Sequence, residues 1–392
     1  MRSRNHREAV IAGAATTPLG RLNTGSSLPL MAAAASDALS EAGLDWSKVD
    51  GLITCTSRTD GWSNPVEALA HYLSMQPSYL ANIDLAGASG VAMVHHAVMA
   101  VEHGLAETVV VLGGQDLLTR TSGPRVVEQL AQNGPMHPEF EAGHEALLPT
   151  TYALITDMHM RRFGTTRQQL ACIARDIRAH ASLNPNAFKR ELLTLEEILS
   201  SPVVSDPLHK LDCSVIADGA AAVVVTSSER ASASHEVGIL GVGYGTRHAW
   251  IGDAEDPTSC GAVESGVAAF RMAGLQPKDI DVLELYDCFT IAVLILLEDL
   301  GFCDKGEAGA MVAEQGIGPG SRLPVTTHGG LLSAGHPGVA GGLFHVVEGI
   351  HQLHGVAGER QVQGAKTALV HGIGGVMGTH ATLLLGSGET HR

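Results

Sequence analysis

The sequence has few aromatic and few basic residues, and it lacks paired cysteines and long apolar runs. Phe, Trp and Tyr make up 4% of 392 residues, and this scarcity, with 46 glycines, fits tightly packed α/β layers better than a β-sandwich. Lys and Arg number 25 against 41 Asp and Glu, so the net charge of −16 makes nucleic acid an unexpected partner. Six isolated cysteines form no C-x-x-C, which argues against a zinc ribbon or a disulfide framework and indicates a cytoplasmic protein. No run is long enough to span a membrane.

What remains is a chain that is 45% hydrophobic and long enough for two or three domains. In the first 114 residues, short apolar runs alternate with segments of helical spacing. Predicted strands cover 9–14, 49–55, 83–85 and 107–113, and predicted helices cover 28–42, 64–75 and 87–103. The first apolar run is too short for a signal peptide and is interpreted as the first strand. This alternation of strands and helices predicts a parallel sheet.

The alternation stops at Gln115 and resumes near Asp212. We therefore predict an N-terminal half formed by residues 1–114 and 212–232, an inserted region at 115–211, and a C-terminal half at 233–392. Two matches in the same order indicate that the halves are related. Residues 38–52 resemble 269–283, and G-A-S-G-V-A at Gly87 resembles G-H-P-G-V-A at Gly335. Each of the latter opens a long helix, so the two helix N-termini are expected to converge on one site.

A glycine-rich loop from Thr327 to Gly338 leads into the second of these helices. His336 lies in the loop, at a helix N-terminus, where free N–H groups and the helix dipole favour negative charge. This position predicts that the imidazole stabilises an oxyanion. The alternative is a purely structural role, in which His336 only caps the helix.

These features together resemble the thiolase superfamily over essentially the whole chain. The residues that carry the resemblance are D-G-A-A-A-V-V-V at 218–225, G-G-x-x-x-x-G-H-P-G at 329–338, Asp212-Cys213-Ser214, Tyr286-Asp287-Cys288-Phe289 and Thr327-His328-Gly329-Gly330. The last three resemble the branch of sterol-carrier-protein thiolases and lipid-transfer proteins. The resemblance implies duplicated βαβαβαββ halves in a five-layer αβαβα fold, a homodimer, and a coenzyme A thioester as the substrate, with no permanently bound cofactor.

Two departures from the family change the expected chemistry. The nucleophilic cysteine that thiolases carry in a C-x-S-G context is replaced by Gly87, and their second, acid/base cysteine is replaced by Gly372. Glycine cannot form a covalent thioester. The site then holds an oxyanion stabiliser and an acid/base, but no nucleophile at the family's position.

Several side chains are candidates for the remaining roles. Tyr286 is predicted as the general acid/base, with Asp287 as an alternative that could merely cap a helix. Cys288 could be a displaced nucleophile or a buried apolar residue, Ser89 an attacking hydroxyl or a helix cap, and His371 a residue pointing into the site. The predicted oxyanion positions at helix N-termini are Gly87, Gly338 and Gly374. Arg161, Arg162, Arg175 and Arg178 lie in a basic segment that either is a solvated face or meets the coenzyme A phosphates. No metal site is predicted.

The favoured function is retro-aldol cleavage of a 3-hydroxyacyl-CoA, in which a base takes the β-hydroxyl proton and an enolate collects near His336. Some lipid-transfer-type relatives cleave steroid side chains in this way with a small zinc-ribbon/OB-fold companion protein, although they carry Tyr at the position of His336. The first alternative is a thiolase or acyltransferase with an atypical nucleophile. The second is a non-catalytic carrier of acyl-CoA or lipid, or a scaffold for the companion.

Overall fold

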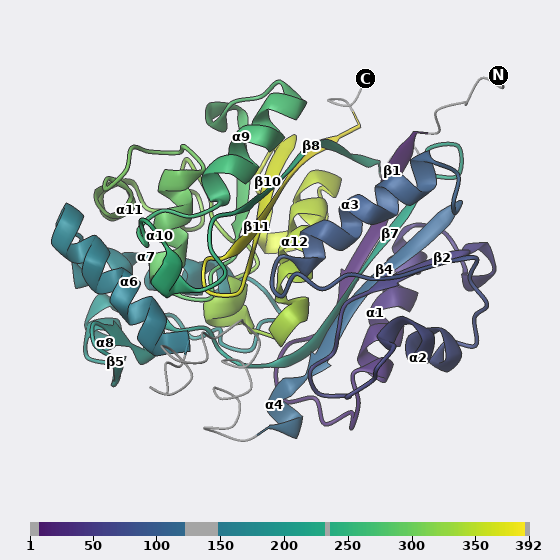
Figure 1. Ribbon diagram of the computed structural model, residues 1–392, viewed down its shortest axis with the longest axis horizontal. Helices are drawn as coiled ribbons and strands as arrows, with labels where there is room; N and C mark the ends of the chain where they lie inside the picture. The colour runs from purple at the N-terminus through teal and green to yellow at the C-terminus, as the bar shows by residue number, and fades with distance from the viewer. Residues whose placement is uncertain (1–7, 122–147, 232–235, 389–392) are drawn as a thin grey trace.

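A nine-stranded mixed sheet organises the part of the chain that the computed structural model describes, which is residues 8–121, 148–231 and 236–388 (Figure 1). The strand order is β3-β2-β4-β7-β1-β8-β11-β10-β9. The strands are β1 (Ala9–Thr16), β2 (Gly51–Thr54), β3 (Tyr79–Asn82), β4 (Thr108–Asp116), β7 (Asp218–Ser227), β8 (Val237–Thr246), β9 (Val282–Leu285), β10 (Thr367–Gly374) and β11 (Thr379–Ser387).

The second half of the sheet mirrors the first. In the first half, β4 is parallel to β2, and β7 is antiparallel to both of its neighbours, β4 and β1. In the second half, β10 is parallel to β9, and β11 is antiparallel to both of its neighbours, β10 and β8. The halves meet where Ile11 of β1 pairs with Val237 of β8. The predicted duplication is confirmed, and the four strands of the first 114 residues share one direction as predicted. Strands joined by helices do share one direction, whereas β7 and β11 insert between them in the opposite direction.

Helices form three layers around the two half-sheets (Figure 1). α3 (Ser89–Glu102) and α12 (Gly341–His354) lie between the half-sheets; α1 (Leu28–Glu41) and α2 (Pro65–Tyr72) cover one outer face, and α9 (Ala262–Ala273) and α10 (Thr290–Asp299) cover the other. The pleat of β4 explains the arrangement, because Val109 and Val111 pack in the central core while Val110 and Leu112 pack under α1 and α2. The five-layer thiolase-like fold is therefore confirmed.

Glycines allow the two central helices to cross with their backbones in contact. A Cβ on Gly90 of α3 would overlap the backbone of Leu343 in α12, and a Cβ on Gly342 would overlap the carbonyl oxygen of Gly87. Because the crossing lies in the first turn of each helix, it draws Gly87 and the loop around His336 to the same place.

The G-x-G-x-G of β8 has a packing role. Cβ atoms on Gly241, Gly243 and Gly245 would overlap carbonyl oxygens of α9 and of the residue before it. The three glycines therefore let α9 lie directly on the strand, and no dinucleotide site is needed to explain them.

The inserted region is largely helical where it is described, and its residues 122–147 lie outside the described part. Its elements are α4 (Leu117–Arg120), α6 (Leu148–Phe163), α7 (Arg167–Ser182), α8 (Leu195–Leu199), β5 (Val203–Ser205) and β6 (Leu208–His209). α7 packs on α10 and on α11 (Ala308–Gln315) of the C-terminal half. None of the described helices is both long enough and apolar enough to span a bilayer.

Two predicted boundaries differ from the structure. The strand expected at 83–85 is instead β3 at Tyr79–Asn82, so the apolar Ile83 and Leu85 belong to the turn that follows it. The helix expected to open at His336 begins at Gly341, after a single 3₁₀ turn. Gly335 and Gly338 have φ values of 140° and 60°, which no right-handed helix contains.

We expect Gly90→Ala to lower the free energy of unfolding by about 2 kcal/mol or more, because the added methyl group must push two helix backbones apart. Gly349→Ala in α12 is the control, because its Cβ would meet side-chain methyl groups and no backbone atom, the nearest being a methyl group of Val370 at 3.1 Å. Thermal and denaturant unfolding would measure both variants. Equal stabilities would show that the helix crossing tolerates a side chain.

Candidate active site

A mostly apolar cavity of about 220 Å³ lies at the N-terminal ends of the two central helices. The end of β9, the C-terminal glycine turn and the inserted region complete its walls. It is lined by Ala86, Gly87, Leu148, Pro149, Tyr152, Val204, Cys213, Ser214, Ile216, Tyr286, Cys288, Phe289, His336, Gly338, Val339, Ile373 and Gly375. The expected convergence of the two helix N-termini on one site is thus seen.

Tyr286 and His336 form the polar centre of this cavity. The Tyr286 Oη lies 3.3 Å from the His336 Nε2, and the two rings are perpendicular. Tyr286 is placed by the end of β9, where its N–H donates to the carbonyl of His371 at 3.1 Å. The His336 backbone is held by residues 215–217, since its N–H donates to the Val215 carbonyl at 2.6 Å.

Burial keeps both side chains of this pair neutral. It lowers the pKa of His336 to about 4, helped by the charge of His345. Burial also raises the pKa of Tyr286 well above its usual value, with smaller contributions from Cys288 and Asp287. A phenol that retains its proton donates to a neutral Nε2, so the hydrogen bond runs from Tyr286 to His336. The His336 Nδ1 is buried without a hydrogen-bond partner among the described residues.

The ring of Tyr286 fills the space that a side chain at position 87 would need. A Cβ on Gly87 would overlap the Tyr286 Cζ and Oη and also the Ile373 carbonyl. A Cβ on Gly372 would lie 2.8 Å from the Cα of Ala88. Neither position where thiolases carry a cysteine has room for one, so both glycines are required by packing.

Asp287 does not line the cavity. Its carboxylate accepts hydrogen bonds from the backbone N–H groups of Leu331 and Leu332, at 2.7 and 3.0 Å. It thereby shapes the one-turn π-helix at Gly330–Ala334, which leads to His336. The predicted use of Asp287 as an alternative base does not fit this geometry, and neither does a role in capping the helix after it.

The other candidate side chains divide between the cavity and the core. Cys288 lines the cavity, but burial raises the pKa of its thiol to about 12, and the thiol donates to the Tyr152 Oη at 3.4 Å. The Ser89 Oγ accepts from the Leu85 N–H at 2.8 Å and is fully buried. His371 points away from the cavity toward Thr382 and His380, with nitrogen–oxygen and nitrogen–nitrogen distances of 2.8 and 3.0 Å.

The predicted oxyanion glycines are only partly at helix ends. Gly87 and Gly338 line the cavity, whereas Gly374 is the last residue of β10, and a Cβ there would lie 2.3 Å from the Leu85 carbonyl oxygen. Gly338 is required because a Cβ there would overlap the Gln115 amide oxygen. The neighbouring Gly375 does line the cavity, so the prediction for the C-terminal turn is displaced by one residue.

The predicted coenzyme A arginines do not form one patch. Arg161, Arg162 and Arg175 form ion pairs with Asp157, Asp256 and Asp176 respectively. Arg178 is 5% exposed, and its Nε donates to the Ser333 Oγ at 2.9 Å. Because its guanidinium is committed inside the protein, Arg178 is not available to a phosphate, which corrects that prediction.

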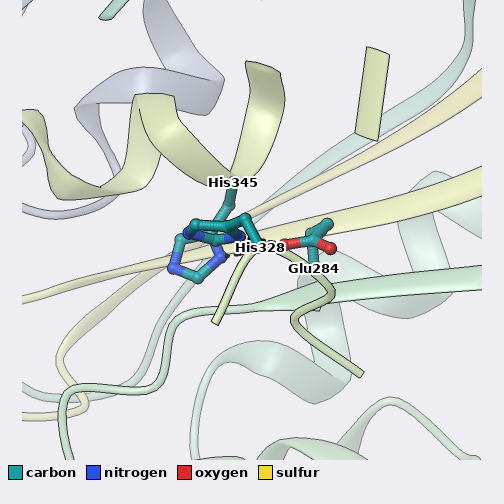
Figure 2. A group of neighbouring side chains, drawn as sticks. All are labelled: Glu284, His328 and His345. Carbon is teal, nitrogen blue, oxygen red and sulfur yellow. Dashed lines mark hydrogen bonds and ion pairs between the residues drawn. The ribbon is translucent and has the colours of Figure 1, made fainter. Parts of the chain in front are cut away.

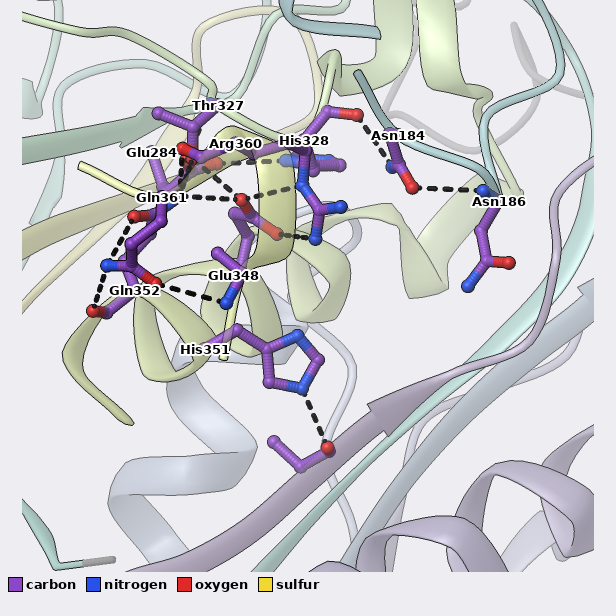
Figure 3. A network of polar contacts seen from close by, with 12 residues as sticks. Asn184, Asn186, Glu284, Thr327, His328, Glu348, His351, Gln352, Arg360 and Gln361 are labelled. Atoms are coloured by element: carbon purple, nitrogen blue, oxygen red, sulfur yellow. Dashed lines mark hydrogen bonds and ion pairs between the residues drawn. The ribbon is translucent and has the colours of Figure 1, made fainter. Parts of the chain in front are cut away.

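A buried charge cluster next to Tyr286 was not predicted from the sequence, and Figure 3 shows four of its members, Glu284, His328, Glu348 and Arg360. Its members are Glu284, Asp287, His328, His345, Glu348 and Arg360. The signal was present in the sequence, since Glu284 stands two residues before Tyr286 in an apolar strand. Burial opposes the ionisation of Glu284, but hydrogen bonds from His328 and His345 hold its pKa at about 2.

Within this cluster, Glu284, His328 and His345 bring three possible metal-ligand atoms within 4.8 Å of one another (Figure 2). The same atoms are joined by hydrogen bonds, since the Glu284 Oε2 lies 3.0 Å from the His328 Nδ1 and 3.3 Å from the His345 Nδ1. The hydrogen bonds and opposite charges therefore account for the cluster without an ion.

We expect Cys288 to react with iodoacetamide at pH 7.5 about a thousandfold more slowly than a free cysteine, because its raised pKa leaves almost no thiolate. Mass spectrometry of the digested protein measures the rate at each cysteine, with Cys288→Ser as the control for assignment. A covalent acyl group on Cys288 after incubation with acyl-CoA would contradict this expectation and establish the alternative nucleophile.

Comparison with known proteins places this geometry in a family. The family model for the thiolase N-terminal domain matches residues 9–229, and that for the thiolase C-terminal domain-like family matches residues 243–387. An acetyl-CoA acetyltransferase of Methanothermobacter thermautotrophicus is 32% identical over 381 residues, 96% of this chain and 98% of its own. A 17-hydroxy-3-oxo-4-pregnene-20-carboxyl-CoA lyase of Mycobacterium tuberculosis is 32% identical, with 96% of each chain covered. A solved structure described as an Ltp2-ChsH2(DUF35) aldolase has a TM-score of 0.83, 27% identity and coverage of 98% and 99% of the two chains. The chain belongs to the thiolase family.

Proposed function

We propose that the protein is a carbon–carbon lyase that cleaves a 3-hydroxyacyl-CoA by a retro-aldol reaction. The observation that carries this proposal is the neutral Tyr286–His336 pair, whose phenol occupies the space that a nucleophile at position 87 would need. The pair can move a proton, whereas positions 87 and 372 hold no thiol that could carry an acyl group. The similarity to a CoA lyase and to an aldolase structure supports the same reaction.

The steps follow from the direction of the Tyr286–His336 hydrogen bond. The β-hydroxyl gives its proton to the Tyr286 Oη while the phenol proton passes to the His336 Nε2. The Cα–Cβ bond breaks, the β-carbon leaves as an aldehyde or ketone, and the electron pair becomes a thioester enolate. His336 then returns its proton to the enolate carbon, which gives a shortened acyl-CoA and restores both side chains.

Two features of the cavity suit an enolate intermediate. We assign the enolate oxygen to the backbone at Gly87 and Gly338, which lie two and three residues before the first residues of α3 and α12, where the helix dipoles favour negative charge. A low pKa of about 4 makes the imidazolium of His336 a strong enough acid to protonate carbon rapidly. The protein therefore stabilises the intermediate and consumes it with the same pair of residues.

The apolar walls of the cavity favour a hydrophobic acyl group. Tyr152 stacks on Phe289 with ring centroids 4.2 Å apart, and Val204 from the inserted region faces the same space. Lipid, steroid side-chain, aromatic and branched aliphatic groups all meet this requirement. We keep Arg161, Arg162 and Arg175 as candidates for contacts with the coenzyme A phosphates.

We further propose a cytoplasmic homodimer that works with a small zinc-ribbon/OB-fold companion protein. The description of the similar structure as Ltp2-ChsH2(DUF35) supports a hetero-oligomer. Co-expression with a companion of this type, followed by gel filtration, tests the assembly. An acyltransferase remains the second candidate because of the acetyl-CoA acetyltransferase relative, and an acyl adduct in mass spectrometry would distinguish it.

We expect Tyr286→Phe and His336→Gln each to lower kcat/KM for retro-aldol cleavage at least a hundredfold, because each removes one end of the proton path. Release of aldehyde or ketone and of shortened acyl-CoA from a panel of 3-hydroxyacyl-CoA thioesters is the measurement, with and without the companion. Tyr244→Phe, at a half-exposed tyrosine bonded to His95, is the matched control and should keep full activity. Full activity in both site variants would reject the assignment, and tight binding without turnover in the unaltered protein would indicate a carrier.

The pH dependence of kcat/KM should show an acidic limb near pH 4 and no limb between pH 5 and 9. As the pH falls through the lowered pKa of His336, its Nε2 gains a proton and can no longer accept one from Tyr286. On the alkaline side the raised pKa of Tyr286 keeps the phenol protonated. An acidic midpoint between pH 6 and 7 would instead indicate an unperturbed histidine as the essential group.

A further inference from the structure

His345 belongs to the buried charge cluster and lies near Glu284 and His328 (Figure 2), with Asp287 as a second neighbouring carboxylate. Its Nδ1 is 3.3 Å from the Glu284 Oε2, and its Nε2 is 3.5 Å from the Asp287 Oδ1. All three side chains are completely buried. The Nδ1 is hydrogen-bonded to Glu284, whereas the Nε2 faces Asp287 at ion-pair distance without a hydrogen bond, so each nitrogen of the ring lies next to a carboxylate. Only the doubly protonated imidazole carries a proton toward both carboxylates.

The charges of the cluster balance only if its histidines carry protons. The cluster holds three buried carboxylates, Glu284, Asp287 and Glu348, and one guanidinium. Arg360 pairs with Glu348 at 3.0 Å, so it does not neutralise the other two (Figure 3). Glu284 is shared by His328 and His345, and its hydrogen bond to His328 raises the pKa of that imidazole against the effect of burial. Burial raises the pKa of Asp287, its carboxylate accepts the Leu331 and Leu332 N–H groups, and His345 is its ion-pair partner. With all three carboxylates ionised, a protonated His328 and a protonated His345 beside Arg360 give three cations for three anions.

His345 also adjoins the Tyr286–His336 pair. The ring centroid of His345 is 5.9 Å from that of Tyr286. His345 also shares α12 with Gly341, and a Cβ atom added to Gly341 would lie 3.6 Å from the His336 Nδ1. Titratable and charged groups from four parts of the fold surround His345 and His336. The end of β9 supplies Glu284, Tyr286 and Asp287, and the glycine-rich loop supplies His328. Glu348 comes from α12, Arg360 from the turn after α12, and His371 from β10. A fixed positive charge here acts directly on the proton affinity of His336.

We propose that His345 is a positioning residue: an imidazolium clamped between Glu284 and Asp287, whose charge keeps His336 neutral so that its Nε2 can accept the Tyr286 proton. The proposal assigns a purpose to a group of buried charges that is costly to fold, since an unpaired ion in the core is strongly destabilising. This role of His345 rests on the proposed lyase function, because that function identifies the proton that passes from Tyr286 to His336. The charge state of His345 and its effect on His336 exist in the resting protein and can be measured there.

The test is an NMR titration of the unaltered protein labelled with ¹⁵N-histidine. Ring ¹⁵N shifts of His345 at pH 7 should be those of an imidazolium, and this measurement needs no variant to fold. In His345→Gln, the titration midpoint of His336 should move up by about one pH unit, a tenfold gain in proton affinity, because one of the two causes of its low pKa is removed. The acidic limb of kcat/KM should move with it.

His354→Gln is the matched control, because His354 lies in the same helix but bonds to Glu41 outside the cluster, with its Nδ1 2.9 Å from the Glu41 Oε1. It should leave the His336 midpoint unchanged. A neutral His345 at pH 7, or a His336 midpoint that stays in place in His345→Gln, overturns the proposal. If the His336 midpoint moves as expected but no lyase activity is found, the proposed function fails and the assignment of His345 stands.

Discussion

The site depends on one contact, the backbone-to-backbone crossing of α3 and α12 at Gly90 and Gly342. Because no side chain separates the helices there, their first turns meet, and Gly87, Gly338 and His336 share one cavity. The two half-sheets on either side hold the crossing in place through a continuous apolar core. The position of the chemistry is thus a consequence of how closely two helices approach in the middle layer of the fold.

The region around the cavity has neutral side chains at the cavity wall and charged side chains behind them. Tyr286 and His336 border the cavity and are neutral. The charged groups behind them come from the end of β9 and from α12. Glu284 near the end of β9 and Asp287 just after it contact the histidines of the charge cluster, whereas Tyr286 between them lines the cavity. One short segment therefore supplies both the reacting group and the carboxylates behind it. Burial sets the neutral state at the front, and paired charges are tolerated only behind it.

Sequence reasoning reached the duplicated fold, the convergence of the helix N-termini and the absence of both family cysteines, because glycine patterns and repeats are local signals. It could not show that the Tyr286 ring fills the space beside Gly87, since that depends on residues 199 positions apart meeting in the fold. It also misjudged Asp287, whose short distance from Tyr286 in sequence hides the opposite direction of its side chain. Arg178 belonged to a basic segment, but only the fold shows that its guanidinium is turned inward to Ser333.

The filled space beside Gly87 constrains how this chain can change. A single Gly87→Cys replacement places a Cβ on the Tyr286 ring and on the Ile373 carbonyl, and Gly372→Cys crowds the backbone of Ala88. Introducing the two cysteines of thiolases would therefore require several substitutions at once, including a smaller residue at position 286 and a shift of the glycine turn. Each cysteine substitution made alone would disrupt the packing. The Tyr286 ring thus excludes a cysteine at position 87, the Ala88 backbone excludes one at position 372, and no single substitution supplies the family's nucleophile.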